Sequence, residues 1–182
     1  MRILILSCLI LAMSCRPEVK KENRKLVDAI DHKVKDIDHN HRVTIIEDDF
    51  VVGDTTYKVR GYVMEGILQK LVGITHSPHF ERDDYFYFEN KKPIFSGHMI
   101  NFMDEQLAEE FKYYYRKNTI VECLFWEDHY KPGKRFPHEH FEEFEPDIDS
   151  LMNEEEERLS FFMSKLDQEG FELKEENDNL IN

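Results

Sequence analysis

Glycine, proline and cysteine are scarce in this chain of 182 residues, which has Gly 7, Pro 6 and Cys 3. So few glycines and prolines exclude a collagen-like or low-complexity chain. No two glycines stand two residues apart, so the chain lacks the G-x-G-x-x-G loop that binds dinucleotides. No serine lies in a G-x-S-x-G turn, so the nucleophile elbow of the α/β-hydrolases is also missing.

Basic residues are also few relative to acidic ones, with Lys+Arg 24 against Asp+Glu 38 and a formal net charge of -14. Proteins that coat nucleic acid or dock electrostatically on anionic lipid need a basic patch, so we expect neither partner. An acidic surface favours cationic partners instead. Hydrophobic residues at 41% and aromatics at 13% exclude disorder throughout and suffice for the core of one domain.

The chain also has no apolar run long enough to span a membrane. Residues 3–13 are almost wholly apolar and follow Arg2. A membrane-spanning helix needs about 20 apolar residues, so this run is too short to cross a bilayer. One positive charge, a short apolar stretch and the small residue Ser14 are typical of a secretory signal peptide, which we assign to residues 1–14.

The sequence AMSC at residues 12–15 resembles the lipobox of bacterial lipoproteins. Most members have Leu three residues before the cysteine, whereas this chain has Ala12 there and Leu11 one position earlier. The resemblance implies that Cys15 is acylated and becomes the mature N-terminus. It also implies an anchor in the cell membrane or outer membrane, with the domain in the periplasm or at the cell surface. Ordinary cleaved secretion and a buried N-terminal strand remain the alternatives.

The three cysteines agree with this interpretation. Cys8 would leave with the signal peptide and Cys15 would carry lipid, so Cys123 has no partner for an intrachain disulfide. Cys123 lies in the apolar run of residues 120–126, where a small buried hydrophobic residue is the expected role.

Residues 15–25 are expected to be the lipidated cysteine and a charged tether containing Pro17, followed by one domain over residues 26–171. A single apolar stripe at helical spacing predicts a helix over residues 24–37. The stripe consists of Leu26, Ile30, Val34 and Ile37.

Three hairpins are predicted between residues 43 and 126, with turns at Gly66, Asn90 and Asn118. Gly and Asn tolerate the positive φ of tight turns. The repeat favours an antiparallel β-meander of six to eight strands, and Pro93 must then lie at an edge or a strand start. With helices at both ends, the fold class is α+β.

Consecutive aromatic residues on the predicted strands are expected mainly to pack on the sheet, with a ligand-stacking platform as the alternative. Tyr113–Tyr115 must point to both faces of one strand, so we expect at least one to be exposed. Residues 104–111 are interpreted as a short helix capped by Asp104.

The clearest helix is predicted from about Asp147 to Gln168, before Gly170. Glu154–Glu157 are expected to lie mostly on its solvent face, and residues 172–182 to form an acidic tail. Residues 136–144 are ambiguous between helix and strand.

Histidine is the one suggestive residue type, with nine in all. His138-Glu139-His140 looks like the start of a zinc-protease helix, but the second histidine would have to be at position 142, which is Glu142. His138 and His140 share a face only on a strand. They and His129 are the candidate metal ligands, and solvated surface histidines are the simpler interpretation.

With these features the chain resembles bacterial cell-envelope lipoproteins. The resemblance is specific only at the N-terminus and implies no active site. We therefore expect a non-enzymatic, membrane-anchored binding or interaction module, without a cofactor, and with a cationic envelope protein as one partner. A lipid-anchored binder of small ligands or metals through exposed tyrosines and histidines is the first alternative. A cell-wall-directed enzyme, which needs a carboxylate pair in a cleft, is the second.

Overall fold

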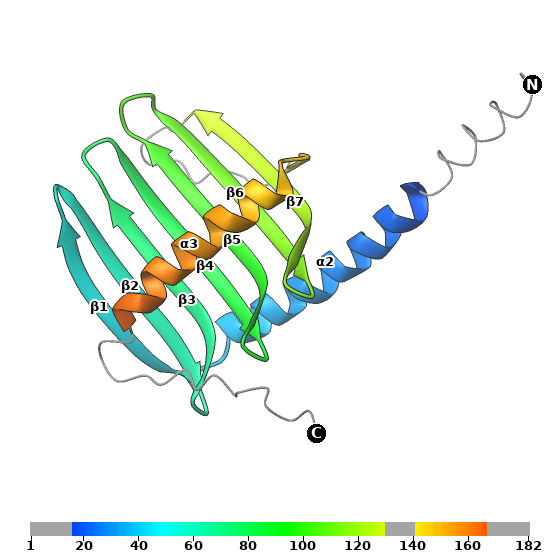
Figure 1. Ribbon diagram of the computed structural model, residues 1–182, viewed down its shortest axis with the longest axis horizontal. Coiled ribbons are helices and arrows are strands. Elements are labelled where there is room, and N and C mark those ends of the chain that lie inside the picture. The colour runs from blue at the N-terminus through cyan, green and yellow to red at the C-terminus, as the bar shows by residue number, and fades with distance from the viewer. Residues whose placement is uncertain (1–15, 130–140, 167–182) are drawn as a thin grey trace, which may run out of the picture.

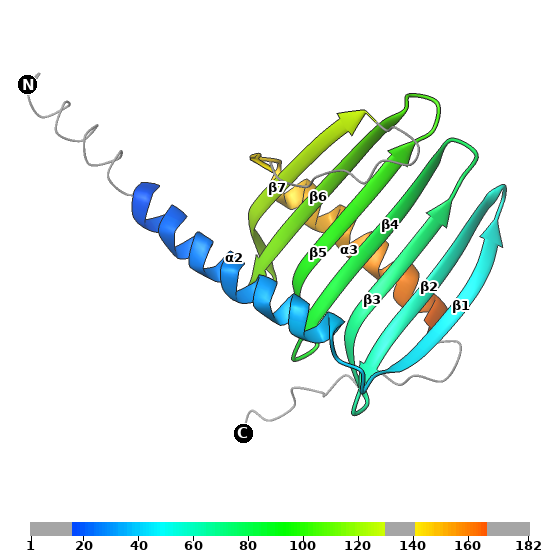
Figure 2. The ribbon, with the colours of Figure 1, turned by 180° about the vertical axis from the view of Figure 1, so that it is seen from behind.

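An eight-stranded antiparallel sheet, in which every strand pairs with the next along the chain, forms the centre of the molecule. The computed structural model describes residues 16–129 and 141–166. One helix covers each face of the sheet (Figures 1 and 2). The predicted α+β meander with flanking N-terminal and C-terminal helices is therefore confirmed. The elements are α2 (Arg16–Asp38), β1 (Thr44–Val52), β2 (Thr55–Met64), β3 (Ile67–His76), β4 (Phe80–Glu89), β5 (Lys92–Phe102), β6 (Leu107–Arg116), β7 (Thr119–His129), β8 (Glu142–Glu143) and α3 (Ile148–Leu166).

The three predicted turn residues lie at hairpin turns and have a positive φ: 81° at Gly66, 52° at Asn90 and 64° at Asn118. Glycine and asparagine adopt this conformation with the least strain, which is why the sequence marks these hairpins clearly. Pro93 is the second residue of β5 and faces Phe88, next to a register shift in the β4–β5 ladder. Its position at a strand start is as predicted.

The prediction of a short helix over residues 104–111 is wrong. Residues 104–106 belong to a turn, and Leu107 already begins β6. β6 pairs with β5 on one side and β7 on the other, so two hydrogen-bonded ladders hold these residues extended. Pairing on both sides overrides the local helix propensity of an acidic segment.

Helix α2 begins at Arg16, well before the predicted start at residue 24, so the segment expected to be a tether is helical. Pro17 suits this start because the first turn of a helix needs no backbone N–H from it. The predicted stripe of Leu26, Ile30, Val34 and Ile37 packs on the sheet against Tyr87, Phe95 and Tyr114. The N-terminal part of α2 extends beyond the β7 edge of the sheet (Figures 1 and 2).

Helix α3 crosses the other face of the sheet (Figure 1). Its predicted start is confirmed, since Asp147 Oδ1 accepts hydrogen bonds from the backbone N–H of Asp149 and Ser150. Phe162 lies directly over Gly73, where a Cβ would overlap the ring, and Leu166 lies against Gly61. These two glycines let the helix approach the strands closely. The core between them includes Val59, Leu71, Phe86 and Phe88.

All three residues of Tyr113–Tyr115 are buried, so the expectation that one is exposed is wrong. The Tyr114 ring packs in the cluster under α2, and its hydroxyl donates to Asp31 of that helix at 3.0 Å. Tyr113 and Tyr115 pack on the opposite face with Ile148 and other residues of α3. A helix on each face therefore removes all three rings from solvent, and sheet packing is their role.

Residues 1–15 and the predicted acidic tail lie outside the described residues. Within the part of the chain that is described, no helix is both long enough and apolar enough to cross a bilayer.

Candidate functional site

A buried histidine connects the sheet to α3. His98 is on β5, directly opposite Asp84 of β4 in the ladder, and both side chains are almost wholly excluded from solvent. His98 Nδ1 lies 2.6 Å from Asp84 Oδ1, and His98 Nε2 lies 3.0 Å from Glu155 Oε2. Glu155 belongs to α3, so the imidazole joins a strand carboxylate to a helix carboxylate.

Two hydroxyl groups complete the surroundings of Glu155. Ser96, two residues before His98 on the same face of β5, donates to Glu155 Oε2 at 2.6 Å. The Tyr115 hydroxyl donates to the same oxygen at 3.1 Å. With the imidazole, three donors therefore surround one buried carboxylate, which is what a carboxylate needs to stay charged away from water.

The pKa values in this cluster shift in the direction of an ion pair. Burial alone would raise the pKa of Asp84 and of Glu155, but the hydrogen bonds from His98, together with the positive charges of His98 and Arg158, outweigh it and hold both below their ordinary range. Burial alone would lower the pKa of His98, but the hydrogen bonds with Asp84 and Glu155, together with the negative charges of these two groups, outweigh it and raise that pKa. The favoured state is an imidazolium between two carboxylates.

Ser96, His98 and Asp84 are the residue types of a hydrolytic triad, but their arrangement is different. The Ser96 hydroxyl contacts Glu155, and the imidazole nitrogen that would accept its proton in a triad also faces Glu155. Ser96 has no solvent exposure. A substrate cannot reach this serine, and the cluster acts as a structural connection between β5 and α3.

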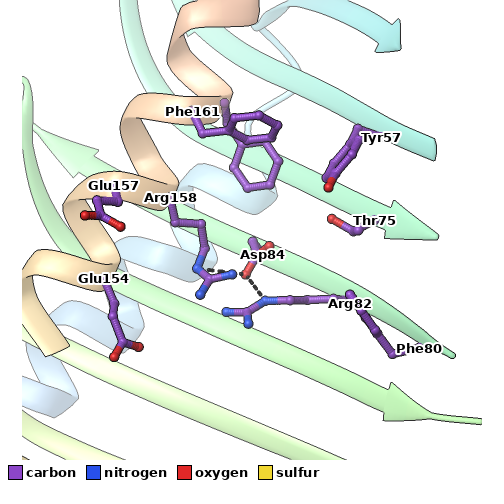
Figure 3. Close-up of a pocket in the computed structure, with 10 residues that line it drawn as sticks. Tyr57, Thr75, Phe80, Arg82, Asp84, Glu154, Glu157, Arg158 and Phe161 are labelled. Atoms are coloured by element: carbon purple, nitrogen blue, oxygen red, sulfur yellow. Dashed lines mark hydrogen bonds and ion pairs between the residues drawn. The ribbon is translucent and has the colours of Figure 1, made fainter. Parts of the chain in front are cut away.

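The cluster reaches the surface through two arginines. Arg82, two residues before Asp84 on β4, donates from Nε to Asp84 Oδ1 at 2.7 Å. Arg158 of α3 approaches the same oxygen, with Nε at 3.9 Å. Figure 3 shows the two side chains reaching Asp84 from the strand and from the helix. Both remain partly accessible, with side-chain exposures of 17% for Arg82 and 27% for Arg158.

A cavity of about 420 Å³ opens over these arginines between α3 and strands β2–β4, and we call it the α3 pocket. Its walls are mainly aromatic, its floor is charged, and two glutamates of α3 stand at its edge (Figure 3). The lining residues are Tyr57, Thr75, Phe80, Arg82, Asp84, Glu154, Glu157, Arg158, Phe161 and Phe162.

Two buried polar atoms at the floor of the pocket lack a hydrogen-bond partner among the described residues, Asp84 Oδ2 and Arg158 Nε. Buried polar atoms in proteins are nearly always hydrogen-bonded, so such a pair requires an explanation. Burial and then repulsion from Arg82 lower the pKa of Arg158. One aspartate therefore does not satisfy both guanidinium groups.

The residues singled out from sequence lie elsewhere or outside the described residues. His129 is exposed at the end of β7, and His138 and His140 fall in the undescribed segment. Over residues 16–129 and 141–166, no three His, Cys, Asp or Glu side chains are arranged to hold a metal ion. Cys123 is buried as expected, and burial raises its pKa to about 11.

Sequence reasoning missed the cluster, although one signal was present. Glu155 occupies a position in the apolar stripe of α3, between Met152 and Leu159, which is the place for a buried charge. The expectation that residues 154–157 lie mostly in solvent is correct for Glu154, Glu156 and Glu157 but wrong for Glu155, which is 5% exposed. Its partners are far along the chain and emerge only from the strand register.

Comparisons of this chain with protein-family models, with curated proteins and with solved structures gave no match.

Proposed function

We propose that this protein is a cell-envelope lipoprotein whose folded domain is a non-catalytic binding module with the α3 pocket as its site. The support for the anchor is the signal-like run of residues 3–13 and the lipobox-like sequence before Cys15. A lipid with two or more acyl chains on Cys15 would hold the protein stably on a membrane. Helix α2 begins at the next residue, Arg16, and already contacts the sheet at Asn23, which donates to the Val121 carbonyl of β7. Its first turns would therefore separate the sheet from that anchor by about 10 Å.

The observation that supports binding is the α3 pocket itself. Its volume lies in the range of small-molecule sites, which combine apolar walls with a few charged groups. Towards its C-terminal end α3 is closely packed on the sheet, with Phe162 and Leu166 seated over glycines. A ligand that filled this cavity could contact the partly accessible guanidinium groups of Arg82 and Arg158 and would stabilise the native state.

A thermal-shift screen of the full chain in detergent tests this function. The compounds are small carboxylates, phosphates, quaternary amines, sugars and divalent metal salts, and Trp126 fluorescence reports unfolding. A compound that binds only the native state must raise the Tm as its concentration rises. We expect one class to do so, and Glu157→Trp, at the pocket edge, to abolish the shift.

The matched control is Glu156→Trp, which is also exposed on α3 but does not line the pocket. It should keep the shift of the unaltered protein. If no compound class raises the Tm, or if both tryptophan variants lose the shift equally, the pocket is not a ligand site.

The strong net charge supports a cationic envelope protein as a second class of partner. Binding of this kind would depend on surface carboxylates rather than on the pocket. It should weaken as salt is raised and should be insensitive to Glu157→Trp.

A further inference from the structure

The charges at the floor of the α3 pocket do not cancel. Asp84 Oδ1 alone accepts from His98 Nδ1 at 2.6 Å and from Arg82 Nε at 2.7 Å, and it lies 3.9 Å from Arg158 Nε. With His98 protonated, three cations face the two buried carboxylates of Asp84 and Glu155. The cluster has one positive charge in excess, although the molecule as a whole is strongly acidic.

The other charges near the pocket limit what can bind. Glu154 and Glu157 line its edge from α3, and both are exposed to solvent. They would repel an anion with two charges more strongly than an anion with one. The floor therefore suits a monoanion, and a guanidinium matches the planar shape of a carboxylate well.

The walls suit an aromatic or similar apolar group. Tyr57 lies 5.3 Å from Phe161 in an edge-to-face arrangement and stacks on Phe50 at 5.0 Å, so these rings form a rigid surface. Phe161 keeps 36% of its surface exposed, and Phe80 lies two residues before Arg82 on the same strand. An apolar group placed against Phe161 would remove this surface from water.

We infer that the α3 pocket binds a small organic monocarboxylate with an apolar body, with the carboxylate on Arg82 and Arg158 and the body against Phe161 and Tyr57. This inference rests on the proposed binding function and specifies the chemistry of its ligand.

The test is a calorimetric titration of the full chain in detergent with N-acetyl-phenylalanine, which has a carboxylate, an amide N–H and a phenyl ring. N-acetyl-phenylalaninamide replaces the carboxylate by a neutral amide, and phenyl phosphate presents a dianion on a phenyl ring. Loss of a charged hydrogen bond weakens binding about ten-fold or more, so the neutral amide should bind at least about ten-fold more weakly. Phenyl phosphate should also bind more weakly, because Glu154 and Glu157 repel a dianion more strongly. Arg158→Gln and Arg82→Gln should weaken binding of the carboxylate to a similar degree.

Three further variants separate binding from folding defects. Arg60→Gln, on the opposite face of β2, removes an arginine that pairs with Glu47 and should leave binding unchanged. Glu157→Gln removes repulsion at the pocket edge and should tighten carboxylate binding about two- to five-fold. Glu156→Gln, its exposed neighbour, should not. An increase in affinity cannot come from a damaged fold.

Three results would overturn this inference. One is equal binding of the neutral amide, a second is tighter binding of phenyl phosphate, and the third is no binding of N-acetyl-phenylalanine. If the thermal-shift screen still finds a pocket-dependent ligand of another class, the proposed binding function stands and only the carboxylate assignment fails. If the screen finds none, both fail.

Discussion

The imidazole of His98 lies between two carboxylates from different layers of the fold, 2.6 Å from Asp84 Oδ1 and 3.0 Å from Glu155 Oε2. Asp84 and His98 belong to neighbouring strands, and Glu155 belongs to the helix that covers them. The position of α3, and with it the shape of the α3 pocket, therefore depends on one buried ion cluster as well as on apolar packing.

This arrangement predicts a stability that falls at both ends of the pH range. The pKa of His98 is raised above 6.5 in the folded protein, so its contribution is complete below pH 6.5 and is lost as pH rises through the raised value. The pKa values of Asp84 and Glu155 are lowered from 3.8 and 4.5, so their contribution is present above pH 4.5 and is lost as pH falls through the lowered values.

Urea unfolding across this pH range measures the effect. His98→Gln should remove the decline on the alkaline side, because glutamine does not titrate. His79→Gln replaces an exposed histidine that pairs with Asp104 and should keep that decline. An unchanged alkaline decline in His98→Gln would show that His98 is not the titrating group.

Glu155→Ala should be far more damaging than the same change at its neighbour. It leaves His98, Ser96 and the Tyr115 hydroxyl buried without their shared acceptor. Removing one partner of a buried ion pair costs about 3–5 kcal/mol, whereas exposed Glu156→Ala should change the free energy of unfolding by less than about 0.5 kcal/mol. Equal effects in chemical denaturation would mean that Glu155 is not buried in solution.

Gly73→Ala should destabilise the domain because a Cβ at this position would overlap the Phe162 ring. Overpacking of this kind costs about 1–3 kcal/mol. The cost should become much smaller in a Phe162→Leu background, where the ring is gone. A double-mutant cycle measured by urea unfolding gives this coupling, and additive effects would show that α3 does not pack on Gly73.

Cys123 should react slowly with thiol reagents in the native protein. Burial raises its pKa to about 11, so about one thiol in a thousand is ionised at pH 8, and the side chain is inaccessible. In a chain with Cys8→Ser and Cys15→Ser, labelling should require unfolding. Adding Ser160→Cys on the exposed face of α3 gives a thiol that labels at once. Fast labelling of Cys123 itself would contradict its burial.

The sheet was predictable from sequence because its signals are local. Gly66, Asn90 and Asn118 mark the hairpins through their backbone conformation, and alternating β-branched and aromatic residues mark the strands. The segment at residues 104–111 misled because helix propensity is also local, while the pairing of Leu107 with His129 is not.

The candidate site was not predictable in the same way. Asp84, His98 and Glu155 are separated by 14 and 57 residues along the chain, and nothing local marks them as partners. Coverage of both sheet faces is likewise a tertiary property, which is why Tyr113–Tyr115 are all buried against expectation. Only the glutamate within the apolar stripe of α3 was a visible sign of a buried charge.

The intact mass of the N-terminal peptide, purified from the membrane fraction of cells that make the full chain, tests the proposed envelope lipoprotein most directly. The account predicts that Cys15 is the first residue and carries a diacylglyceryl group, with residues 1–14 removed. A peptide that retains residues 1–14 and has a free thiol at Cys15 would contradict it.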